Sequence, residues 1–255
     1  MTNIYVDQFD SYPDELKECI KKYSTTIKKY INTGIERSDN AIESSLEWTS
    51  VFKDLELNKL FMEFWSIASK YFFIGYHVTR ICSLAEIQKN GLLILEFENY
   101  KNRLSKVLQE HDISQEEIDY AMMRIKKMYD GYLGERKERI CFFAPNSLLY
   151  SGNFDYFARN YGGEIAERAF ENHKGMEKVW NTLTGIGKPV MVTFRFHLTD
   201  LYDFQYEMVF INMLRFLSAK MFMDYDLPIG IGQHIKKCIP PSDILAIQEI
   251  EIQEF

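Results

Sequence analysis

Residues 71–91 read YFFIGYHVTRICSLAEIQKNG and contain the clearest sequence signals for the fold of this chain. Aromatic and β-branched side chains dominate the beginning of this stretch, which predicts a strand over 71–79. Ser83 stands where a helix N-cap belongs, and Gly91 stands where a left-handed C-terminal cap belongs. The stretch therefore predicts a strand, a short helix over 84–90, a glycine and a second strand over 92–95.

The sequence before this stretch has the period of helices. Apolar and aromatic residues recur at helical spacing on both sides of Gly34, and no strand signal interrupts them. We therefore predict a helical N-terminal region over 1–70, followed by a second domain over 71–255.

The second domain is predicted to combine strands with helices. A helical pattern over 97–136 contains a capping box at Ser114–Glu117, and we interpret it as a helical insertion. Further strands are predicted over 139–143, over 189–196 and at the C-terminal end, with helices between them. The stretch 207–222 fits a buried helix and, in parts, a strand. The expected fold class is therefore α+β.

The composition is that of a globular protein. The chain has 255 residues, of which 46% are hydrophobic and 26% are charged. Its formal net charge of -7 disfavours a protein that coats nucleic acid. No stretch approaches the ~20 apolar residues of a membrane helix, and the N-terminus lacks the pattern of a signal peptide. The four cysteines have no C-x-x-C spacing. We expect a cytoplasmic protein, or one delivered into a target cell without a signal peptide, and no membrane partner.

Short motifs for phosphate and metal binding are incomplete. The run GIGK at 185–188 lacks the first glycine of a phosphate-binding loop, and Pro189 stands where a Ser or Thr is needed. His234 and Cys238 are four residues apart, but no second pair completes a zinc site. We therefore expect no bound metal.

Four features follow one another along the second domain. In order, they are YHVT (76–79) with SLAEIQKNGL (83–92), ICFF (140–143) with a polar turn and the aromatic helix 150–161, the strand 190–196, and IPPSDI (239–244) before a final strand. This order resembles the ADP-ribosyltransferase fold, particularly its compact bacterial toxin branch and the related RNA 2′-phosphotransferases. The resemblance covers about residues 72–252 and is interrupted by the helical insertion.

The resemblance implies that NAD+ is bound as a co-substrate in a cleft of a split β-sheet. His77 would hydrogen-bond the nicotinamide ribose, since a neutral imidazole has one donor and one acceptor nitrogen. Thr79 would lie on the same face of the strand, because side chains alternate with a period of two. Gly91 and Phe143, from the first two features, are further candidates for cofactor binding.

The resemblance also implies an aromatic ring that stacks on the nicotinamide, since this base offers a π-face and an amide edge. Tyr150, Tyr156 and Tyr161 are the candidates, and we prefer Tyr156. The alternative for each ring is a place in the hydrophobic core.

The catalytic acid is the point at which the sequence departs from the family pattern. In the toxin branch a glutamate precedes the final Ile-Pro turn, but here residues 232–235 read GQHI. Gln233 could hold a ribose hydroxyl, but it cannot act as a base. Glu164 follows two glycines, which permit close approach of a ligand, and Glu207 follows the segment 200–206. We favour Glu164 as the catalytic acid and keep Glu207 as the second candidate.

The function that the resemblance implies is NAD+-dependent mono-ADP-ribosyl transfer to a macromolecule, as in a toxin or defence effector. The negative net charge favours a protein acceptor over a nucleic acid. An inhibitor or antitoxin protein is a further expected partner. One alternative is an NAD+ glycohydrolase, in which water replaces the acceptor. The other is an inactive module of the same fold that binds a nucleotide or a protein, for which the missing acid before Ile239 is the main support.

Overall fold

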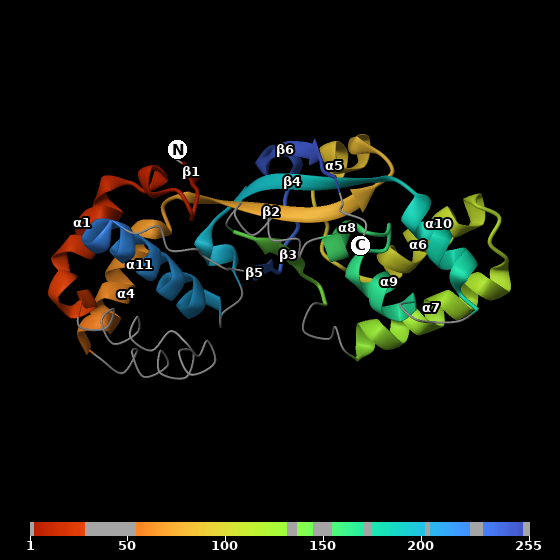
Figure 1. The fold of residues 1–255 in the computed structure, drawn as a ribbon, viewed down its shortest axis with the longest axis horizontal. Coiled ribbons are helices and arrows are strands. Elements are labelled where there is room, and N and C mark those ends of the chain that lie inside the picture. The colour runs from red at the N-terminus through yellow and green to blue at the C-terminus, as the bar shows by residue number, and fades with distance from the viewer. Residues whose placement is uncertain are drawn as a thin grey trace. The chain divides into compact units, whose positions relative to one another are not determined.

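The computed structural model describes residues 3–28, 55–131, 137–144, 155–170, 175–201, 205–224 and 232–251 (Figure 1). Within these residues the chain combines helices with a β-sheet, so the predicted α+β class is confirmed. The chain divides into two compact units, each made of two chain segments. The first unit comprises Met1–Ile74 and His197–Ile231, and the second comprises Gly75–Phe196 and Gly232–Phe255.

The first unit is built on the helices α1 (Asp14–Lys22), α4 (Leu55–Ala68) and α11 (Gln205–Met223). Acidic residues begin α1 and lysines end it, an order that complements the helix dipole. Both α4 and α11 contact α1. The ring of Phe210 on α11 meets the rings of Phe61 and Phe64 on α4 at centroid distances of 5.0 and 5.3 Å. Aromatic packing therefore joins the two chain segments of this unit.

The division into units differs from the predicted domains in one respect. Residues 197–231 belong with the N-terminal helices and not with the rest of 71–255. The reason is the composition of α11, whose side chains are buried on most sides, so that it fills a helical core. The ambiguous stretch 207–222 is thereby a helix. The predicted helical pattern within 29–54 lies outside the described residues.

The sheet has the order β5-β3-β2-β4-β6, and β1 also pairs with β2. Its strands are β1 (Asn3–Ile4), β2 (Phe72–Ile81), β3 (Ile140–Phe143), β4 (Lys188–Phe196), β5 (Gly232–Ile235) and β6 (Ile244–Glu249). β3 is antiparallel to β2 and to β5, and β4 is antiparallel to β6. The predicted strands at 71–79, 139–143, 189–196 and the C-terminal end are thus confirmed.

Three short elements differ from the sequence prediction. β1 and β5 were not expected, since strands of two and four residues are too short to show a period. The predicted strand at 92–95 is instead a single bridge between Leu92 and Ile239. Leu92 is buried in the core and Leu93 is exposed, so this run of apolar residues does not require a strand.

One face of the sheet carries an aromatic core. The Phe142 ring lies edge-on to Phe194 at 5.2 Å and to Phe196 at 4.8 Å. A Cβ at Gly75 would lie 2.7 Å from Phe142 and 2.8 Å from Phe194, so only glycine allows β2 to approach these rings. Side chains along a strand alternate between its two faces, so positions 75, 77 and 79 lie on the same face of β2. The face that meets the aromatic rings at Gly75 therefore continues along β2 toward His77.

The helices of the second unit are α5 (Leu84–Asn90), α6 (Phe97–Glu110), α7 (Gln115–Asp130), α8 (Asp155–Ala158), α9 (Gly163–Phe170) and α10 (Glu177–Gly185). The capping box of Ser114 and Glu117 begins α7, as predicted. α6, α7, α9 and α10 share one hydrophobic core and lie together in Figure 1. The predicted insertion is therefore an integral part of this unit. No helix in the described part of the chain is long and apolar enough to cross a membrane.

Candidate functional site

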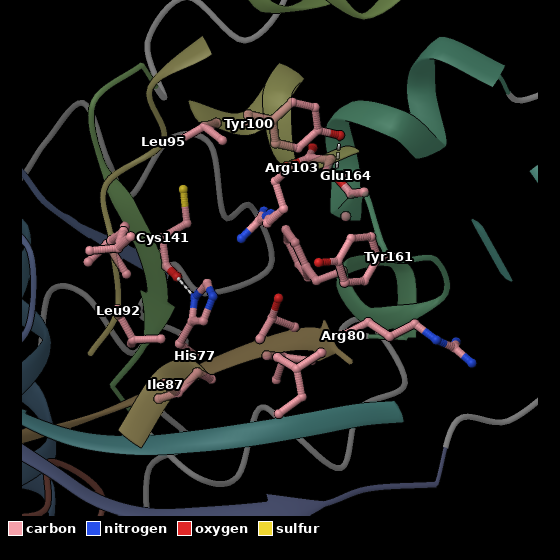
Figure 2. Close-up of a pocket in the computed structure, with 18 of the residues that line it drawn as sticks. His77, Arg80, Ile87, Leu92, Leu95, Tyr100, Arg103, Cys141, Tyr161 and Glu164 are labelled. Carbon is pink, nitrogen blue, oxygen red and sulfur yellow. Dashed lines mark hydrogen bonds between the residues drawn. The ribbon is translucent and has the colours of Figure 1, made fainter. Parts of the chain in front are cut away.

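A cavity of about 390 Å³ lies in the second unit, among β2, β3, α5, α6 and the turn that leads into α9 (Figure 2). Its volume is within the range of small-molecule sites, which is roughly 300–1,000 Å³. All lining residues come from 77–165, so the second unit supplies the whole cavity. The residues with polar side chains that contribute to its lining are His77, Thr79, Arg80, Glu86, Asn90, Tyr100, Arg103, Arg139, Cys141, Tyr161 and Glu164.

The wall that α5 forms is fixed at both ends. The Ser83 hydroxyl accepts a hydrogen bond from the Ala85 N–H at 3.2 Å, which caps the helix. At the other end Gly91 has φ +72°, and a Cβ there would lie 1.9 Å from the Ile239 carbonyl oxygen. Leu92 and Ile239 exchange two backbone hydrogen bonds of 2.9 Å. Gly91 thus lets the chain turn closely against Ile239 and places the wall of the cavity.

His77 is held in one tautomer. Its Nδ1 lies 2.7 Å from the carbonyl oxygen of Cys141, and a carbonyl only accepts, so Nδ1 carries the proton. Burial lowers the pKa of His77 from its ordinary value of 6.5, which keeps the ring neutral at pH 7. Nε2 is then a hydrogen-bond acceptor. Figure 2 shows the ring pointing into the cavity, where it could accept a hydrogen bond from a hydroxyl group.

Two tyrosines and one arginine form the opposite wall. The guanidinium carbon of Arg103 lies 5.7 Å from the centroid of the Tyr161 ring and 6.0 Å from that of Tyr100. Tyr100 donates its hydroxyl proton to the Gly162 carbonyl at 2.8 Å. Burial raises the pKa of Tyr161 to about 12, so its phenol is neutral at pH 7. The wall therefore presents neutral rings and one cation.

The turn that carries Tyr161 and Glu164 is fastened from the outside by Arg80. The Arg80 Nε donates to the carbonyl oxygen of Ile186 at 2.7 Å. Its Nη1 donates to the carbonyl oxygens of Ala158 and Arg159, at 3.2 and 2.9 Å. Burial lowers the pKa of Arg80, as expected for a guanidinium taken from water. Figure 2 shows its side chain directed away from the cavity, so its role there is structural.

A buried polar network holds the same turn from within. Asn160 is fully buried, its Oδ1 accepts from the Gly162 N–H at 2.8 Å, and its Nδ2 donates to Glu167 at 2.9 Å. Glu167 also pairs with Arg159 at 2.8 Å. Each buried polar group of Asn160 thereby has a partner, which fixes the backbone on both sides of Tyr161.

Glu164 is the second residue of α9 and lines the cavity. Its side chain is 9% exposed and pairs with the Arg168 Nε at 3.1 Å. The first turn of a helix favours a carboxylate there. The two preceding glycines also line the cavity, and the fold itself requires glycine at both positions. A Cβ at Gly162 would lie 2.3 Å from Ala166, and Gly163 has φ +63°, so packing and backbone conformation require them.

Four of the predicted site residues meet at this cavity, namely His77, Thr79, Gly91 and Glu164. Tyr161, one of the three tyrosine candidates, also lines it. The side chain of the preferred Tyr156 and the whole of Tyr150 lie outside the described residues.

Of the predicted residues whose side chains the structure describes, Phe143 and Gln233 are not on the wall of the cavity. The ring of Phe143 lies edge-on to Phe157, which does line the cavity, at 5.7 Å. Gln233 lies in β5 opposite Phe142 of β3, and it is buried. Its Oε1 has no hydrogen-bond partner among the described residues. Glu207 lies on α11 in the first unit, and its side chain is outside the described residues.

Tyr100, Arg103 and Cys141 line the cavity without having been expected there. Tyr100 and Arg103 are three residues apart, a spacing that puts two side chains on one face of a helix. This spacing is the only feature of the local sequence that could have indicated Tyr100 and Arg103. Among the described residues, no group of three or more His, Cys, Asp or Glu side chains could hold a metal ion.

Comparisons with protein-family models, with curated proteins and with solved structures found no match for this chain.

Proposed function

We propose that this protein is an NAD+-dependent mono-ADP-ribosyltransferase that modifies a macromolecule, and that its second unit is an ADP-ribosyltransferase-like domain. One observation carries the proposal. His77, Thr79 and Gly91, selected from the stretch 71–91, and Glu164, selected from a later part of the sequence, line a single cavity of suitable size. Composition gives no reason for Glu164 to meet the other three residues, so their meeting supports the proposal.

The residues of the cavity suit the binding of a nicotinamide ribose. The Nε2 atom of neutral His77 accepts a hydrogen bond from a ribose hydroxyl. The ring of Tyr161 lines the cavity, and we propose it as the partner on which nicotinamide stacks. Tyr161 thereby replaces Tyr156 as our preferred stacking residue.

Glu164 is the proposed catalytic carboxylate. In the reaction the bond between C1′ of the ribose and the nicotinamide nitrogen breaks, and its electron pair leaves with nicotinamide. Glu164 stabilises the positive charge that develops on the sugar. As the acceptor forms its bond to C1′, Glu164 takes the proton that the acceptor loses. The reaction needs NAD+ as co-substrate and no metal. The proposed acceptor is a protein, and an inhibitor protein is a further proposed partner.

The first experiment measures nicotinamide release from NAD+, with and without cell lysate, together with the transfer of label from NAD+ to macromolecules. We expect lysate-dependent labelling that His77→Ala abolishes. His111→Ala is the matched control, because the His111 Nδ1 also bonds a backbone carbonyl, that of Val107 at 2.9 Å, but lies outside the cavity. Turnover by a folded His77→Ala protein would remove the proposed site.

Product analysis separates the alternatives. Free ADP-ribose without labelled macromolecules would identify an NAD+ glycohydrolase. Binding of NAD+ without release of nicotinamide would identify an inactive nucleotide-binding module, and so would overturn the proposal.

A further inference from the structure

Arg103 is an exposed cation on the wall of the cavity. It lies on α6, whose neighbouring residues Tyr100 and Leu104 are buried and fix the helix. Figure 2 shows its guanidinium directed into the same space as the His77 ring. The side chain of Arg103 is otherwise exposed, so a ligand reaches it without displacing core residues.

The aromatic rings hold Arg103 without consuming its hydrogen bonds. Tyr161 and Tyr100 contact the guanidinium through their ring faces, at 5.7 and 6.0 Å. A cation–π contact uses the face of the guanidinium and leaves its N–H groups for acceptors in the plane. Arg103 forms no ion pair with a carboxylate among the residues that the structure describes. An anion is the partner that this arrangement lacks.

Two of the other charged residues of the lining are engaged elsewhere. The lining contains three arginines and two glutamates, which gives a formal charge of +1. Arg80 donates to three backbone carbonyls and points away, and Glu164 is paired with Arg168. Glu86 is exposed, and its charge adds to the rise in pKa that burial gives Cys82 and Tyr161, but Arg103 acts on Tyr161 more strongly and lowers its pKa. A cationic centre therefore remains beside Tyr161.

We propose that Arg103 and the two tyrosines form a phosphate subsite that binds the diphosphate of a nucleoside diphosphate ligand. The guanidinium binds phosphate oxygens bidentately, which a lysine cannot do. This inference rests on the proposed function, because it assigns the diphosphate of NAD+ to α6 while His77 takes the ribose. It adds a ligand contact from the helical insertion, which the family resemblance does not supply.

The test compares the affinities for ADP and adenosine, measured by titration calorimetry. We expect the full-length protein to bind ADP more tightly than adenosine. We expect Arg103→Gln to lower the ADP affinity by about tenfold or more and to leave the adenosine affinity unchanged. Arg103→Lys should recover only part of the loss. Lys106→Gln is the matched control, because Lys106 is an exposed cation on the same helix that pairs with Glu110; its ADP affinity should equal that of the wild type.

Two results would overturn the subsite: ADP binding by Arg103→Gln within about twofold of the wild type, or equal affinities of the wild type for ADP and adenosine. Circular dichroism of each variant establishes that it is folded. The outcome is separable from that of the proposed function. Arg103-dependent ADP binding without NAD+ turnover would keep the subsite and reject the transferase. NAD+ turnover with an unchanged KM in Arg103→Gln would reject the subsite and keep the transferase.

Discussion

The Nδ1 atom of His77 donates a hydrogen bond to the carbonyl oxygen of Cys141 across 2.7 Å. This bond is separate from the backbone ladder that pairs Tyr76 with Phe143, so it adds a side-chain link between β2 and β3. It also determines which ring nitrogen carries the proton. A contact that stabilises the sheet therefore leaves the acceptor nitrogen of His77 for a ligand.

The first prediction is a pH dependence of stability that comes from His77. Because burial lowers the pKa of His77 below 6.5 in the folded protein, the unfolded chain binds a proton first as the pH falls. The free energy of unfolding should therefore decrease as the pH falls below about 6.5, and His77→Gln should reduce that decrease. Urea unfolding of both proteins at about pH 8 and about pH 5.5 measures the difference. An equal loss in both proteins would show that His77 titrates normally.

The second prediction concerns the network beneath Tyr161. Asn160→Ala removes the partner of the Gly162 N–H and one partner of Glu167, which keeps its ion pair with Arg159; both groups are buried. We expect the free energy of unfolding to fall by about 1–3 kcal/mol. Asn99→Ala is the control, because Asn99 donates to Glu96 at the surface, and it should change stability by no more than about 0.5 kcal/mol. Similar values for the two variants would mean that the network contributes little.

The local signals in the sequence were the most accurate guides to the fold. Ser83 and Ser114 cap the helices they were predicted to cap, because capping depends on residues within one turn. The pairing of β5 with β3 was missed, because it joins residues almost a hundred positions apart. For the same reason the sequence did not show that α11 packs with α1.

The residues of the candidate site were likewise predicted where local sequence signals mark them and missed where distant contacts place them. His77 and Glu164 were selected from short motifs and their neighbours, and both line the cavity. Arg103 was not selected, because nothing in its own neighbourhood indicates that α6 faces β2. Its position follows from the core that α6 shares with α9, a contact between distant segments.

The third prediction tests the requirement for glycine at position 91. Gly91→Ala places a Cβ 1.9 Å from the Ile239 carbonyl oxygen, in a residue with φ +72°. We expect a loss of about 1–3 kcal/mol in the free energy of unfolding. Gly185→Ala is the control, because a Cβ there meets nothing within 4 Å and lies at the end of α10. It should be neutral or stabilising by up to about 1 kcal/mol, as alanine favours helices. Equal changes in the free energy of unfolding of the two variants would show that the turn at Gly91 can relax around a Cβ.

The fourth prediction separates the charge of Glu164 from its place in the cavity. Glu164 and Glu177 each stand in the first turn of a helix, α9 and α10, so each carboxylate interacts with a helix dipole in the same way. Only Glu164 lines the cavity; Glu177 accepts a hydrogen bond from the Gly175 N–H at the surface.

We expect Glu164→Gln to lower kcat for nicotinamide release by about 10²–10⁴-fold with little change in KM, since a neutral amide can neither take a proton nor stabilise positive charge. Glu177→Gln should leave both constants unchanged. Steady-state kinetics of the two variants make the comparison. Retention of kcat in Glu164→Gln would reject Glu164 as the catalytic carboxylate, and Glu207→Gln would then test the second candidate. Because glutamine keeps the size of the side chain and can still accept from Arg168, a loss of rate would report the charge at this position and not its packing.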